Sequence, residues 1–236
     1  MKKILILIIA TIIFLSSPSY AHHLWVAATN GNYSVNRGMI SDRTDAYDPA
    51  CVKEIRAYGK DGTKMPVQRI DESQRVTFHT DGSVALATVV SEWGDRVNTT
   101  RGKKMMNRQA AEDAGLTVIS AFFSTQYSKI LFAPSVLNQK ALGMKFEILP
   151  ITDPMTAGPG ELIAFKLFFE GQSLTGISIF TNDGQESKTD TNGVAHIAFK
   201  NKGTQLLYAK HQTPDESGRQ LDYLKFMTFL IFEAKK

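Results

Sequence analysis

Short β-prone segments separated by glycine-bearing turns run through most of the chain, and this pattern constrains the fold more than any other feature. Segments such as 23–27, 53–58 and 84–90 combine valine, alanine, threonine and aromatic residues. Turn signals such as Lys60-Asp-Gly62 and Asp81-Gly82 punctuate the chain between such segments. This alternation is typical of strands joined by tight connections. The sequence therefore predicts an all-β protein.

The last part of the chain shows the pattern most regularly. Its expected strands are 162–170, 175–181, 193–200, 204–211 and 224–233. Evenly spaced short strands with glycine-bearing turns predict a small antiparallel sandwich, which we expect to be of the transthyretin or immunoglobulin type. We place an N-terminal β domain at 22–143 and a C-terminal β-sandwich domain at 144–236, so that the chain holds two β-sandwich-like domains.

One segment departs from the strand pattern. Residues 102–124 contain basic side chains, a pair of methionines and the stretch 107–114, whose composition favours a short helix. We expect Lys103 and Lys104 in this segment to form a solvated loop face.

The first 21 residues have the composition of an export signal. Lys2 and Lys3 precede an apolar run at 4–15, and the segment ends in Ser19-Tyr-Ala21, a small-x-small cleavage site. The apolar run is shorter than the roughly 20 residues that span a bilayer, and an uncleaved anchor is the alternative. Cleavage after Ala21 predicts a periplasmic protein with no stable membrane insertion.

The charge balance of the predicted mature chain argues against nucleic acid and acidic membranes as partners. The chain has 27 Lys and Arg against 23 Asp and Glu, and removal of Lys2 and Lys3 leaves 25 against 23. A chain so close to neutrality has no polybasic surface for nucleic acid or for an acidic membrane. The single cysteine, Cys51, excludes an intramolecular disulfide. We interpret it as a small buried hydrophobe, with metal binding or pairing between chains as the alternative.

Short motifs follow one another along the second half of the chain in a recognisable order. They are Glu147-Ile-Leu-Pro150, Asp153-Pro154, Gly160-Glu161, Gly171-Gln-Ser-Leu-Thr-Gly176, Thr189-Asp-Thr-Asn-Gly-Val-Ala195 and Lys210-His211. Two further stretches lie nearer the start, Ala21-His22-His23-Leu-Trp25 and Tyr127-Ser-Lys-Ile-Leu131. Together they resemble the DUF4198 family, whose members are described as periplasmic components of nickel and cobalt uptake systems. Relatives often carry a Gly-His-x-Phe-Pro stretch, and the matching region here, 36–42, has no histidine.

Histidines at the predicted mature terminus are the main candidate metal ligands. Cleavage after Ala21 frees the α-amine of His22, and the unperturbed pKa of such an amine, about 7.7–8.0, lets it lose its proton easily. This amine and the His22 ring form a chelate, and His23 adds a second imidazole. Nitrogen donors of this kind suit nickel, cobalt, copper and zinc. The family resemblance adds His211, at the end of an expected strand. Cleavage after Tyr20 is the alternative and makes His23 the third residue.

These observations predict a periplasmic binding protein for a divalent transition metal of the nickel and cobalt class, with copper and zinc as further candidates. The family resemblance implies that it delivers the metal to a membrane uptake transporter or buffers it for one. No phosphate loop, nucleophile elbow or His-Glu-x-x-His motif occurs, so we expect a binding protein and not an enzyme. The copper brace of oxidative polysaccharide monooxygenases is the enzymatic alternative. The other alternative is an envelope module that binds a non-metal ligand or has a structural role.

Overall fold

The computed structural model describes residues 22–158, 160–199 and 202–234, most of which lie in β-strands. These strands form sheets that pack face to face, which confirms the predicted all-β class with sandwich-like packing. The predicted signal segment, 1–21, lies outside the described residues.

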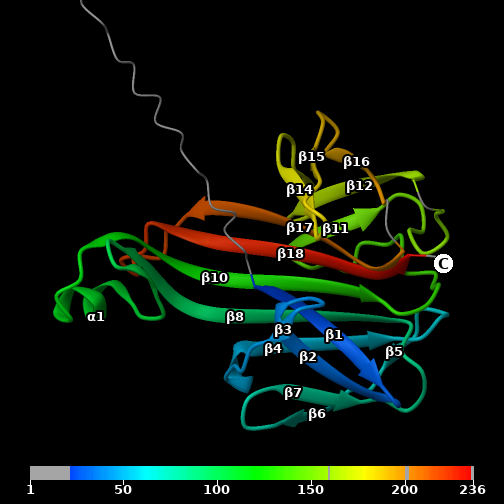
Figure 1. The fold of residues 1–236 in the computed structure, drawn as a ribbon, viewed down its shortest axis with the longest axis horizontal. Helices are drawn as coiled ribbons and strands as arrows, with labels where there is room; N and C mark the ends of the chain where they lie inside the picture. Colours follow the sequence, from blue (N-terminus) through cyan, green and yellow to red (C-terminus); the bar gives the residue numbers. More distant parts are fainter. Residues whose placement is uncertain (1–21, 159, 200–201, 235–236) are drawn as a thin grey trace, which may run out of the picture.

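A long central sheet runs through the middle of the molecule (Figure 1) and combines strands from both predicted domains. Its order is β15-β14-β17-β18-β10-β8-β4-β5, and β9 also pairs with β8. The strands are β4 (Val52–Tyr58), β5 (Lys64–Met65), β8 (Leu86–Thr99), β9 (Gly102–Lys104), β10 (Val118–Leu131), β14 (Ser178–Thr181), β15 (Glu186–Lys188), β17 (Gly203–Pro214) and β18 (Tyr223–Ala234). The two halves of the chain meet where β10 and β18 pair in parallel, with Phe122 opposite Tyr223 and Leu131 opposite Phe232.

Two smaller sheets cover the two faces of the central sheet (Figure 1). The N-terminal sheet has the order β1-β2-β7-β6, with β3 paired to β2; its strands are β1 (His23–Thr29), β2 (Asn32–Met39), β3 (Arg43–Thr44), β6 (Gln68–Asp71) and β7 (Val76–His79). The C-terminal sheet is built from β11 (Phe146–Pro150), β12 (Leu162–Phe169), β13 (Gln172–Ser173) and β16 (Val194–Ala198). The predicted domain boundary between residues 143 and 144 falls in the connection from β10 to β11 and stays a prediction.

Burial of both faces of the central sheet explains the continuous apolar run near the end of the chain. In β18, Met227, Phe229 and Ile231 pack toward the N-terminal sheet, whereas Leu230 and Phe232 pack toward the C-terminal sheet. Because successive side chains of a strand point to opposite faces, a strand buried on both faces needs apolar residues at successive positions. The two cores therefore share one sheet as a common wall.

The predicted short helix is confirmed as α1 (Arg108–Asp113). Asn107 caps it, because its side chain accepts a hydrogen bond from the Ala110 amide at 2.8 Å. A single 3-10 turn, η1 (Pro49–Cys51), leads into β4, and Cys51 is half-buried beside the apolar core. Within the described part of the chain, no helix combines the length and apolar character needed to cross a bilayer.

Candidate functional site

The start of β1 is fixed to the central sheet by side chains of β10. Gln126 Nε2 donates a hydrogen bond to the His22 carbonyl oxygen at 3.2 Å, and Ser128 Oγ donates to the Leu24 carbonyl oxygen at 2.7 Å. Both donors are buried. Because backbone carbonyls near the core need partners, these bonds give the beginning of β1 a defined position.

His22, the residue before β1, forms a pair with Asp45. His22 Nε2 lies 2.9 Å from Asp45 Oδ2, while Asp45 Oδ1 accepts a hydrogen bond from Arg43 Nε at 3.2 Å. Asp45 reaches this position because the chain folds back after β2, and the Asp45 amide donates to the Arg37 carbonyl at 2.7 Å. Glycine is needed at Gly38, where φ is +143° and a Cβ would collide with the Arg43 carbonyl oxygen.

The two terminal histidines have different surroundings. The side chain of His22 is 39% exposed, and burial followed by the charge of Arg37 lowers its pKa. His23 is buried; its Nδ1 accepts a hydrogen bond from the Ile40 amide at 3.2 Å, and its ring lies 6.0 Å from the Phe229 ring. Burial lowers the pKa of His23 to about 4. Both rings favour the neutral form, which is the form that binds a metal, but His22 is the more accessible.

His211 lies away from this pair. Its ring packs on Phe169 at 4.6 Å and on Phe146 at 6.0 Å, and burial lowers its pKa. His23 contacts Tyr208, which precedes His211 by three positions on β17 and therefore points to the opposite face of the central sheet.

The structure thus brings His22 to Asp45 and does not bring His211 to either terminal histidine. Among the described residues, no group of three or more His, Cys, Asp or Glu side chains is placed to hold a metal ion. The ligand roles of His23 and His211 stay predictions.

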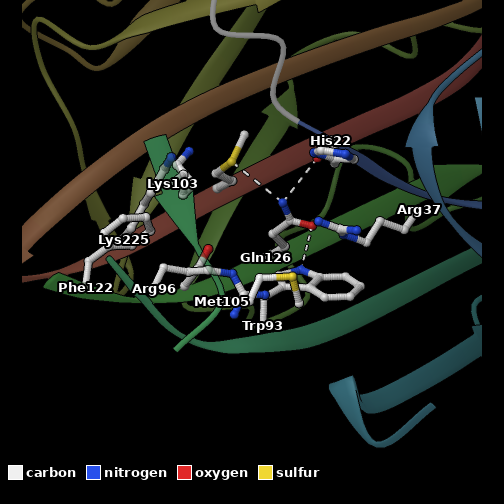
Figure 2. Close-up of a pocket in the computed structure, with 11 residues that line it drawn as sticks. His22, Arg37, Trp93, Arg96, Lys103, Met105, Phe122, Gln126 and Lys225 are labelled. Carbon is white, nitrogen blue, oxygen red and sulfur yellow. Dashed lines mark hydrogen bonds between the residues drawn. The ribbon is translucent and has the colours of Figure 1, made fainter. Parts of the chain in front are cut away.

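A pocket opens beside His22, between the start of β1 and the central sheet (Figure 2). It has a volume of about 240 Å³. Four of its lining residues are basic and come from β2, β8, β9 and β18: Arg37, Arg96, Lys103 and Lys225. The other lining residues are His22, Trp93, Met105, Phe122, Ser124, Gln126 and Met227. We call this cavity the basic pocket; none of its lining residues is acidic.

Positive charge in the basic pocket is partly desolvated. Burial, followed by the charges of Lys103 and Lys210, lowers the pKa of Lys225 to about 8. Burial, followed by the charge of Arg37, lowers the pKa of Arg96. Like charges near one another disfavour the charged form of each, and these four basic side chains make the cavity electropositive.

Sequence reasoning did not identify Asp45, Arg37, Arg96 or Lys225 as site residues. They lie far apart in the sequence, and only the pairing of strands brings them to one place. One signal was present: Lys225 is a charged residue inside the expected apolar strand 224–233. A charge within a buried strand needs a partner or a functional reason.

Comparison with known proteins gives one match. A family model described as a domain of unknown function (DUF4198) matches residues 19–213. No curated protein and no solved structure matches the chain.

Proposed function

The chain belongs to the DUF4198 family, a domain of unknown function, and we propose that it is a periplasmic protein that binds a divalent transition metal at the start of β1. The metals that we propose are nickel and cobalt, with copper and zinc as further candidates. The protein would deliver the ion to a membrane uptake transporter or buffer it for one. The periplasmic location rests on cleavage of the predicted signal after Ala21.

One observation carries this proposal: His22 Nε2 and Asp45 Oδ2 are 2.9 Å apart beside the predicted mature terminus. Cleavage after Ala21 adds the free α-amine of His22 to this pair. An amine, an imidazole and a carboxylate make a compact set of two nitrogen donors and one oxygen donor, which suits late first-row divalent metals better than magnesium or calcium. In this proposal Asp45 takes the place of the predicted ligands His23 and His211.

The neighbours of this pair support a metal site with a fixed geometry and a moderate affinity. Arg43 bonds to the other oxygen of Asp45 and so orients the carboxylate toward His22. Arg37 Nη1, however, lies 4.0 Å from the same oxygen that faces the ring, and its charge repels a metal cation. We therefore expect dissociation constants near the micromolar range, about 10⁻⁶ M. His23 has a positioning role in this proposal, since its Nδ1 is bonded to the Ile40 amide.

The test is native mass spectrometry of the exported protein without an N-terminal tag, followed by calorimetric titration with nickel, cobalt, copper and zinc. We expect a chain that starts at His22 and binds one metal ion. Asp45→Asn keeps the shape of the side chain and removes its charge, and we expect it to weaken binding about tenfold or more. A Gly-Ser extension before His22 removes the α-amine and should weaken binding by a similar factor.

A mature chain that stays metal-free after challenge at micromolar concentrations contradicts the proposal. The alternative function, an envelope module for a non-metal ligand, is favoured by a separate observation, the basic pocket. Four basic side chains are an unfavourable environment for a cation and a favourable one for an anion.

A further inference from the structure

We propose that the basic pocket binds a small oxyanion with at least two negative charges, such as a di- or tricarboxylate or a phosphate. The proposal does not rest on metal binding by His22, because it uses a different set of side chains. It assigns a ligand class to a cavity that the sequence motifs did not indicate.

The first argument is the convergence of positive charge. Arg37, Arg96, Lys103 and Lys225 come from four strands of two sheets and line one cavity of about 240 Å³. In Figure 2, Arg37 approaches from one side of Gln126, and the two lysines approach from the other. No acidic residue lines the cavity. Mutual repulsion in a partly desolvated space is unfavourable, and a bound anion offsets it.

The second argument is that Arg96 is buried with part of its guanidinium group unpaired. Only 8% of Arg96 is exposed, and its Nη1 donates to the Asp95 carbonyl oxygen at 2.9 Å. Its Nη2 is buried and has no hydrogen-bond partner among the described residues, and the same holds for Nε of Arg37. A buried guanidinium N–H without a partner is unfavourable. Carboxylate and phosphate oxygens are the acceptors that match a guanidinium group best.

The aromatic residues in the pocket argue against a flat aromatic ligand. The guanidinium carbon of Arg37 lies 4.5 Å from the Trp93 ring centroid. The ammonium nitrogens of Lys103 and Lys225 lie 5.8 Å and 5.5 Å from the Phe122 centroid. The faces of the Trp93 and Phe122 rings are therefore already occupied by cations, which the rings help to orient. The pocket is also smaller than the roughly 300–1,000 Å³ typical for drug-sized ligands, so its ligand is small.

The test is calorimetric titration of metal-free mature protein with citrate, inorganic phosphate and acetate. We expect citrate or phosphate to bind with a dissociation constant below about 1 mM. Acetate, with one charge, should bind at least about tenfold more weakly. The tighter of the first two probes shows whether the ligand class is a polycarboxylate or a phosphate. Absence of binding by both at 10 mM, or about 10⁻² M, overturns the proposal.

A matched pair of variants separates the pocket from general charge attraction. Arg96→Met removes the buried guanidinium, whereas Arg101→Met removes the same charge from an exposed position on the β8–β9 turn. We expect at least about tenfold weaker anion binding for Arg96→Met and no change for Arg101→Met. Equal losses in the two variants contradict a specific site. If Arg96→Met unfolds, Lys225→Met at the half-buried wall of the same pocket gives the same comparison.

A further measurement separates this proposal from the metal site. The chain with a Gly-Ser extension before His22 lacks the α-amine that metal binding needs, but it keeps all four basic side chains. We expect it to bind citrate or phosphate as tightly as the mature chain does. Anion binding that appears only after nickel is added overturns the proposal, whatever the outcome for the metal.

Discussion

Two buried basic side chains on neighbouring strands of the central sheet have opposite environments. Lys129 of β10 is fully buried; its Nζ donates to the Lys140 carbonyl oxygen at 2.7 Å and lies 3.3 Å from Glu147 Oε1. Glu147 in turn accepts hydrogen bonds from the Leu142 amide. Arg96 of β8 is nearly as buried, yet its Nη2 has no partner among the described residues, and no carboxylate lines its pocket.

The difference separates a structural ion pair from a candidate binding site. Lys129 faces the C-terminal sheet, where its charge pairs with a carboxylate of that sheet, and its Nζ also donates to a carbonyl oxygen of the connection that follows β10. Arg96 lines a pocket on the side where β1 begins, and its charge is not neutralised. A cation with an internal partner adds to fold specificity, whereas a cation without one favours an external anion.

The largest expected loss of stability comes from removing the carboxylate that pairs with Lys129. Glu147→Gln leaves Lys129 in an apolar environment without a counter-charge, and burial already lowers the pKa of Lys129. We expect the free energy of unfolding in urea to fall by about 3–5 kcal/mol. Replacing both residues, as in Lys129→Met with Glu147→Leu, should recover most of this loss. A loss below about 1 kcal/mol for Glu147→Gln shows that the pair is not a structural element.

The second prediction concerns Arg96 in the basic pocket. Arg96→Met should change the free energy of unfolding by less than about 1 kcal/mol, because it removes an unsatisfied buried charge. Citrate or phosphate at a hundred times its dissociation constant should stabilise the wild-type chain by about 2.7 kcal/mol. The same anion should not stabilise Arg96→Met, and thermal unfolding with and without the anion measures both. A large loss of stability in Arg96→Met without ligand means that Arg96 has a structural partner.

The sequence predicted the strands of these two regions better than their pairing. Expected segments 162–170 and 224–233 agree with β12 (Leu162–Phe169) and β18 (Tyr223–Ala234), because local propensity and turns limit where a strand can run. The parallel pairing of β10 with β18 joins residues about a hundred positions apart, such as Phe122 and Tyr223, and local sequence has no information on it.

The candidate site also depends on strand pairing that local sequence does not determine. His22 could be proposed as a ligand from the sequence because its expected chemistry depends on the predicted cleavage position next to it. Its partner Asp45 follows from the fold-back after β2, which local motifs do not encode. Lys103 is exposed as expected, but the predicted loop is wrong: Lys103 and Lys104 lie in β9, and its pairing with β8 places Lys103 at the basic pocket.

The third prediction uses the pH dependence of the pocket. The pKa of Lys225 is lowered to about 8, and the charged groups that face it are Lys103 and Lys210. An anion binds the protonated form better and therefore raises this pKa. Citrate, which keeps its three charges above about pH 7, should bind with full affinity between about pH 7 and 8, and its affinity should fall about tenfold as the pH rises from 8 to 9.5, with proton uptake on binding near pH 8. Lys225→Arg stays charged and should show a flatter profile. An affinity that does not change over this range removes Lys225 from the site.

The smallest expected effect on stability comes from two neutral side chains that show the same contrast between a partnered and an unpartnered buried group. Ser128 and Ser91 are both fully buried on adjacent strands of the central sheet. Ser128 Oγ donates to the Leu24 carbonyl of β1, whereas Ser91 Oγ has no partner among the described residues. Ser128→Ala should therefore lower the free energy of unfolding by about 1 kcal/mol, and Ser91→Ala should leave it unchanged or raise it slightly.

Hydrogen exchange at β1 sharpens this last prediction, because Ser128 bonds to the strand that directly follows His22, one of the residues lining the basic pocket. Loss of its hydroxyl should speed exchange of the amides near Leu24, while Ser91→Ala leaves them protected. Equal effects of the two substitutions mean that burial alone sets the contribution of a polar group on this sheet. The contrast between Lys129 and Arg96 then loses its basis, because both are buried and differ in whether the fold supplies a carboxylate partner.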